Sequence, residues 1–152
     1  MRELVALLER NGFESVSTYI QSGNVVLQSN EDSSKEIETL IANEFGFNPK
    51  VLVLEKSEFE SAVEKNPFNP TEGKSVHFYF CRKQPNLNLE KVQKFIAESE
   101  KYHLEGKVFY LYAPNGIGRS KLVANLESCL GTPATGRNLN TINKLSQMAE
   151  NV

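Results

Sequence analysis

The sequence is almost without aspartate, tryptophan and histidine. Asp32 is the single aspartate among 19 acidic residues, there is no tryptophan, and His77 and His103 are the two histidines. EF-hands, Walker-B magnesium sites and aspartyl dyads use aspartate, so these sites lack their usual ligands. With two histidines, a catalytic triad with a histidine base is nearly excluded. The sequence therefore shows no recognisable combination of catalytic acid, base and nucleophile. It leaves open whether the protein is an enzyme.

Cysteine is equally scarce. Cys81 and Cys129 lie far apart, with no CxxC pair and no cluster of histidines, so we expect neither a disulfide framework nor a zinc or other metal site. His77 and Cys81 fall four residues apart in one expected strand, about 13 Å by strand rise, too far for a catalytic pair. Neither cysteine has a basic neighbour at short spacing, which favours packed thiols in a reducing cytoplasm.

Long hydrophobic runs are also missing. The longest, such as residues 108–113, fall far short of the roughly 20 residues that cross a bilayer, and no secretory signal is visible. Hydrophobic content of 39%, charged content of 24%, a net charge of -2 and a mean hydropathy of -0.39 are typical of a soluble globular protein. We expect one compact domain over 1–152, cytoplasmic and without a membrane partner.

Hydrophobic periodicity, glycine endings and capping boxes predict five elements in the first part of the chain. They are a helix over about 2–11 ending at Gly12, a hairpin over 16–27 with its turn near Gly23, a helix over 33–45 from the Ser33/Glu36 box, a strand over 50–55, and a short helix from the Ser57/Glu60 box through Lys65. The strand is apolar without alternation, so we expect it at the centre of a sheet.

A linker over 66–74, with Pro67 and Pro70, precedes the second part. The predicted elements there are a strand over 75–81, a helix over 89–96, a hairpin of 102–104 with 107–113 about Gly106, a helix over 122–130 closed by Gly131, and a last helix over 142–149. Comparing pseudo-halves 1–65 and 75–152 predicts an α+β fold with ferredoxin-like character, built from two βαββα-type halves. The first half then lacks a strand ahead of Arg2.

Three motifs resemble the bacterial domain-of-unknown-function 1697 (DUF1697) family. They are Thr18–Val26 (TYIQSGNVV), Pro114–Leu122 (PNGIGRSKL) and Thr135–Thr141 (TGRNLNT). Gly136 and Leu139 stand where family members usually have Ala and Trp. Members usually begin with a strand ahead of the first helix, where this chain has none. The resemblance implies an α+β, ferredoxin-related fold and no established activity.

The strongest candidate site is the loop before the predicted helix at 122. Gly116, Gly118, Arg119, Ser120 and Lys121 combine a glycine turn, a helix N-terminus and two cations, the elements that hold a phosphate group. The spacing matches neither a Walker A motif nor a dinucleotide fingerprint. The alternative is a tight connection in which Ser120 or Asn115 caps the helix.

Arg137 and Asn138 fall in the expected loop before the last helix, where Arg137 can add a cation and Asn138 can complete the site or cap the helix. Residues 1–60 hold 5 basic and 11 acidic side chains, a net of -6, and residues 61–152 hold 12 and 8, a net of +4. The basic part contains both loops, which favours an anionic partner there. The first hypothesis is therefore a phosphate-bearing small molecule, with no cofactor indicated.

Two other functions stay open. The aromatic residues Tyr79, Phe109, Tyr110 and Tyr112 on predicted strands either stack on single-stranded nucleic acid or form the core of the sheet. Alternatively, an uncovered sheet edge gives the protein a structural role as an oligomer.

Overall fold

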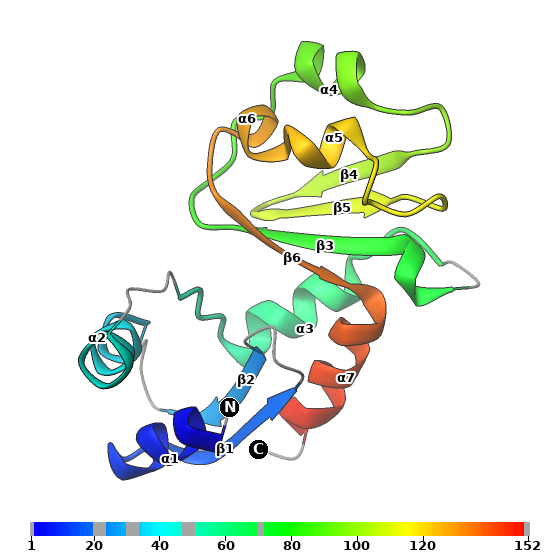
Figure 1. Ribbon diagram of the computed structural model, residues 1–152. Helices are drawn as coiled ribbons and strands as arrows, with labels where there is room; N and C mark the ends of the chain where they lie inside the picture. The colour runs from blue at the N-terminus through cyan, green and yellow to red at the C-terminus, as the bar shows by residue number, and fades with distance from the viewer. Residues whose placement is uncertain (1, 20–23, 30–33, 47–50, 70–71, 151–152) are drawn as a thin grey trace. The chain divides into compact units, whose positions relative to one another are not determined.

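The computed structural model describes residues 2–19, 24–29, 34–46, 51–69 and 72–150. It is an α+β structure whose chain forms two compact units (Figure 1). Unit 1 comprises residues 1–60 and 143–152, and unit 2 comprises residues 61–142. The chain crosses from one unit to the other between residues 60 and 61 and again between residues 142 and 143, and both positions lie within helices. Neither lies in the linker predicted over 66–74.

Unit 1 is built on a hairpin and two helices. Strands β1 (Glu14–Tyr19) and β2 (Asn24–Gln28) pair antiparallel, and helices α1 (Arg2–Arg10) and α2 (Ser34–Phe45) supply most of the core. The buried core residues are Leu7, Leu8, Phe13, Ile37 and Ile41. Gly12, with a φ of +91°, ends α1 in the left-handed conformation as expected. The expected turn near Gly23 and the Ser33 cap lie outside the described residues.

The strand predicted over 50–55 does not form in the described residues 51–55. The Val51 N–H donates to Glu38 Oε1 at 2.8 Å instead of to a neighbouring strand, and Val53 is 36% exposed. An apolar run forms a strand only where a ladder partner is at hand. The second capping box is also misplaced. Helix α3 (Lys56–Glu64) starts one residue before Ser57, and Glu58 Oε1 accepts from the Glu55 N–H at 3.2 Å.

Unit 2 contains an antiparallel sheet in the order β4-β5-β3-β6 (Figure 1). The strands are β3 (Val76–Cys81), β4 (Lys101–Glu105), β5 (Val108–Tyr112) and β6 (Ala134–Asn138). All six residues of β3 are buried. Strand β6 was not predicted, because its sequence, ATGRN, has little β propensity, and it forms by pairing with the free edge of β3.

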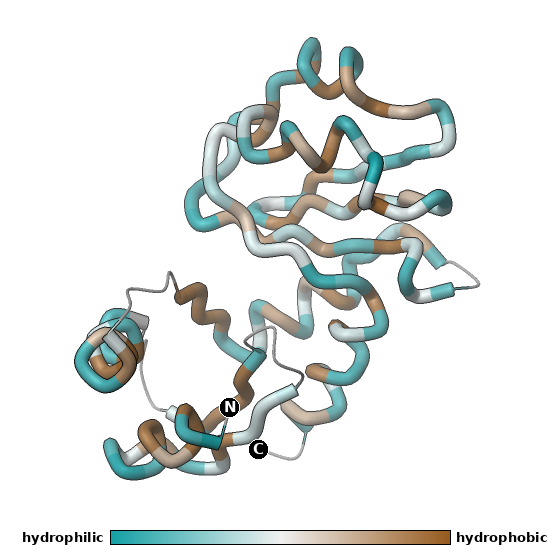
Figure 2. The backbone as a smooth tube through the Cα atoms, in the orientation of Figure 1, coloured by the Kyte–Doolittle hydropathy of each residue, from teal (hydrophilic) through white to brown (hydrophobic). Residues whose placement is uncertain are grey.

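Helices α4 (Leu89–Phe95), α5 (Lys121–Ala124) and α6 (Leu126–Leu130) pack on one face of this sheet. Figure 2 shows apolar residues along β5 and in α5, the helix packed against it. The single helix predicted over 122–130 is two short helices that meet at Asn125, and Gly131 closes the second with a φ of +72°. Between α3 and β3 lies a short 3-10 helix, η1 (Gly73–Ser75), and α7 (Leu139–Glu150) follows β6.

The two faces of the sheet carry different residues of β3. His77, Tyr79 and Cys81 share the face of α4 to α6, and Phe78 is on the other. On that other face the Tyr110 hydroxyl donates to the Ala62 carbonyl of α3 at 2.5 Å. None of the described helices is long and apolar enough to cross a membrane.

Candidate functional site

The glycine loop follows β5 directly. The Ala113 N–H donates to the Ser75 carbonyl at 2.7 Å, which ties the start of the loop to the residue before β3. The Gly116 N–H then closes a turn onto the Ala113 carbonyl at 3.0 Å, with Gly116 at a φ of +85°. Glycine is needed at position 116 because that backbone conformation strains other residues.

Ser120 anchors the end of the loop. Its Oγ accepts from the Val123 N–H at 3.2 Å as the N-cap of α5, and its hydroxyl donates to Glu100 Oε2 at 2.7 Å. Glu100 is buried, with 8% of its surface exposed, and its Oε1 accepts from the Ala97 N–H at 2.9 Å. The capping alternative is thus observed, and the Ser120 hydroxyl is already engaged by a carboxylate of the chain itself.

The remaining loop residues face solvent. Gly118, Arg119 and Lys121 are exposed, and neither cation makes an ion pair within the described part of the chain. Gly118 has an ordinary φ, and a Cβ built there meets nothing within 4 Å. Neither backbone conformation nor packing demands a glycine at position 118, so this segment offers bare backbone directly before the two cations.

The structure places Arg137 and Asn138 on β6 rather than in a loop. Arg137 is directly opposite Phe78, on the face away from α5, and its Nη1 donates to the Gly136 carbonyl at 2.7 Å. Burial lowers the pKa of Arg137. Asn138 is opposite His77, on the face of α5, and its Oδ1 accepts from the Thr141 N–H at 2.9 Å. Asn138 therefore caps α7, and the two residues lie on different faces.

Two polar residues on β3, His77 and Tyr79, were not among the site residues predicted from the sequence. His77 and Tyr79 are each 8% exposed, and their rings stack with centroids 6.3 Å apart. Within the described part of the chain, neither His77 Nδ1 nor the Tyr79 hydroxyl has a hydrogen-bond partner. Burial lowers the pKa of His77, while burial and then the Glu100 charge raise the pKa of Tyr79 to about 12. Both groups are therefore uncharged near neutral pH. The sequence showed a polar residue in an apolar strand, but nothing that distinguishes a partnered from an unpartnered one.

The thiols show no sign of nucleophilic activation. Cys81 and Cys129 are buried and unbonded to each other. Burial raises the pKa of Cys81 to about 11, and burial raises the pKa of Cys129 against a smaller opposing effect of Lys91. Across the described ranges, no group of three or more His, Cys, Asp or Glu side chains is placed to hold a metal ion.

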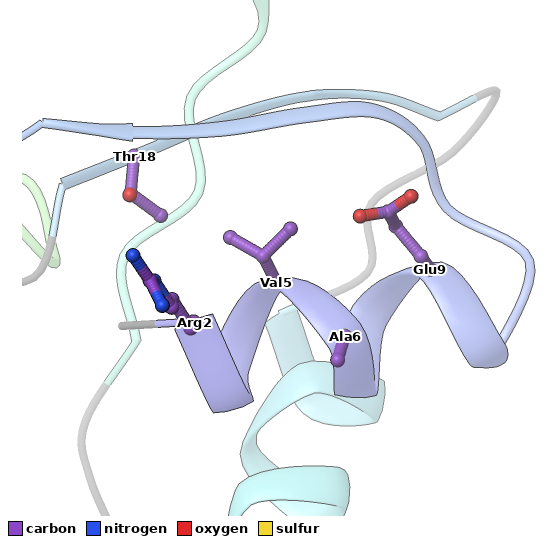
Figure 3. Close-up of a pocket in the computed structure, with 5 residues that line it drawn as sticks. All are labelled: Arg2, Val5, Ala6, Glu9 and Thr18. Carbon is purple, nitrogen blue, oxygen red and sulfur yellow. The ribbon is translucent and has the colours of Figure 1, made fainter.

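Unit 1 has a shallow hollow of about 300 Å³ between α1 and β1 (Figure 3). Arg2, Val5, Ala6, Glu9 and Thr18 line it, with the side chains of Arg2 and Glu9 at its two ends. One positive and one negative side chain give the hollow no net charge, so it is a poorer anion site than the loop of unit 2.

The family model described as "Protein of unknown function (DUF1697)" matches residues 1–110. The chain belongs to the DUF1697 family. The match includes the motif at Thr18–Val26 and ends before the glycine loop and β6. A search of the curated proteins finds no match.

One solved structure similar to this DUF1697 protein is the conserved bacterial protein SP0830 from Streptococcus pneumoniae. The two chains are 22% identical, the alignment covers 98% of this chain and 88% of that one, and the TM-score is 0.67. At this identity the likeness establishes the fold alone.

Proposed function

We propose that this DUF1697 protein binds a phosphate-bearing small molecule on the exposed loop from Gly116 to Lys121. The observation that carries the proposal is Gly118, a glycine required by neither backbone conformation nor space, which directly precedes two exposed cations that form no ion pair with any described residue. An amide on bare backbone can approach a phosphate oxygen closely, and Arg119 and Lys121 supply charge-assisted hydrogen bonds.

Ser120 has a supporting role in this site. Its hydroxyl holds the loop to the buried Glu100 carboxylate, which fixes the backbone next to the two cations. Asn138 stays a candidate neighbour on the same face of the sheet, whereas Arg137 starts from the opposite face. The core of the proposed site is therefore Gly116, Gly118, Arg119 and Lys121.

The test is calorimetric titration and thermal shift with inorganic phosphate against the variant Arg119→Ala/Lys121→Ala. We expect at least a tenfold loss of affinity with an unchanged melting temperature, because both side chains are exposed. A ligand at 100 times its Kd stabilises by about 2.7 kcal/mol, which the wild type should show and the variant should not. Lys101→Ala/Lys107→Ala is the matched control, since it removes two exposed cations of the same unit. Equal affinity in all three proteins would refute the site.

The nucleic-acid alternative is less favoured by the structure. Phe109 and Tyr110 are fully buried and Tyr79 is nearly so, while the half-buried Tyr112 stacks on Phe68. Bases need exposed rings to stack on. An oligomer formed through the edge strands β4 or β6 is a separate prediction, which sedimentation velocity over a range of concentrations would test.

We further infer that unit 2 is a ferredoxin-like unit of a cytoplasmic protein. Its elements run β3, α4, β4, β5, α5 with α6, and β6, and its sheet is antiparallel with helices on one face. This βαββαβ order supports the inference. Two unbonded cysteines are compatible with a reducing compartment.

A further inference from the structure

Two buried polar atoms on the helix-covered face of β3 have no hydrogen-bond partner among the residues that the structure describes. They are Nδ1 of His77 and the hydroxyl of Tyr79, both in side chains more than nine-tenths buried. Leaving a buried polar group without a hydrogen bond destabilises the folded state. Tyr110, one strand away on the other face, shows the ordinary solution, because its buried hydroxyl donates to Ala62. The contrast calls for a partner that the chain does not supply.

The backbone makes room for this arrangement. Gly136 is directly opposite Tyr79, and a Cβ at position 136 would approach Cε1 of the Tyr79 ring to 2.5 Å. The missing side chain lets the ring lie over β6, the edge strand, whose five residues are all half-buried. The Tyr79 ring thus packs on the backbone of β6 and in the core beneath α4 to α6.

The glycine loop begins beside the N-terminal end of β3, on the side of β5. Ala113, where the loop begins, is tied to Ser75, and His77 is two residues further along, about 7 Å by strand rise. Glu100 links the regions from the other side, since it accepts the Ser120 hydroxyl and its charge acts on Tyr79. His77 and the start of the glycine loop thus lie at the same end of β3.

We propose that His77 and Tyr79 hydrogen-bond the hydroxyl groups of a sugar whose phosphate lies on the loop from Gly116 to Lys121. This inference rests on the proposed function and adds the chemical class of the ligand. The two side chains are uncharged hydrogen-bonding groups beside a carboxylate, which suits neutral hydroxyls and disfavours a second phosphate or a carboxylate. Both atoms are closed to solvent, so a ligand reaches them only when this face of the sheet opens.

The test compares Tyr79→Phe with Tyr110→Phe, the same substitution on opposite faces of one sheet. The probes are ribose 5-phosphate, glucose 6-phosphate and inorganic phosphate. In the wild type we expect at least one sugar phosphate to bind ten times more tightly than inorganic phosphate. Tyr79→Phe should abolish this preference without lowering the melting temperature, because it deletes an unpartnered hydroxyl and keeps the ring. Tyr110→Phe should lower the melting temperature and keep the preference.

The outcomes separate the two proposals. If inorganic phosphate binds but neither sugar phosphate binds more tightly, or if Tyr79→Phe keeps the preference, the sugar site is refuted and the phosphate loop stands. If Tyr79→Phe loses as much stability as Tyr110→Phe, the hydroxyl has a partner in the free protein, such as a buried water, and the argument for a ligand fails. If no probe binds, the proposed function fails as well.

Discussion

At the scale of single residues, chemistry in this protein follows from the neighbours rather than from residue type. Tyr79 and Tyr110 are both buried sheet tyrosines whose pKa is raised to about 12, first by burial and then by a nearby glutamate. Of the two, only Tyr110 has an acceptor for its hydroxyl among the described residues. The sequence could predict that both rings pack in a sheet, but not which hydroxyl finds a partner, because that depends on where α3 comes to lie.

His77 gives the stability of the protein a pH dependence. Burial lowers its pKa in the folded state below the 6.5 of the unfolded chain. As pH falls through 6.5, the unfolded chain therefore takes up a proton that the native chain does not, and stability declines by up to about 1.4 kcal/mol per pH unit. Urea unfolding between pH 7.5 and 5.5 should show this decline in the wild type and a shallower one in His77→Gln. Equal slopes in the two proteins would contradict the assignment.

At the scale of elements, the sequence predicted the ends of helices and hairpins, which depend on neighbouring residues. It did not predict strands whose pairing depends on distant segments. Gly12, Gly106 and Gly131 end their elements with positive φ, as their sequence contexts predicted. Strand β6 and the absence of a strand over 51–55 were not predictable in this way, because a strand depends on a ladder partner elsewhere in the chain. The same holds for the candidate site. Its loop was visible as a motif, whereas the Glu100 partner of Ser120 comes from 20 residues away.

Helix α5 should depend on Ser120 more than its one-turn length suggests. Ser120→Ala removes the cap of α5 and one of the donors to the buried Glu100 carboxylate. We expect a loss of about 1–3 kcal/mol in the free energy of unfolding, measured with urea. Ser120→Thr keeps a hydroxyl and should recover most of that loss. A stability change below about 0.5 kcal/mol in Ser120→Ala would show that neither hydrogen bond contributes in solution.

At the scale of the whole molecule, the two units differ in the size and burial of their sheets. Unit 2 has a four-stranded sheet with an entirely buried strand, β3. The described part of unit 1 has a two-stranded sheet, and none of the residues of β1 is buried. A hairpin alone is marginal in water and depends on the helices packed against it. The units should therefore differ in local stability, even though one chain passes between them twice.

Hydrogen exchange followed by mass spectrometry measures this difference directly. Amides of β3 and β5 should exchange slowest, because opening them requires loss of the core beneath α4, α5 and α6. Amides of β1 and β2 should exchange earlier, through opening of the hairpin. A sugar phosphate bound as proposed should slow exchange in β6 and the loop before α5, and it should leave β1 and β2 unchanged. Equal protection of the two sheets would mean that the units unfold together, and ligand protection confined to β1 and β2 would move the binding site to unit 1.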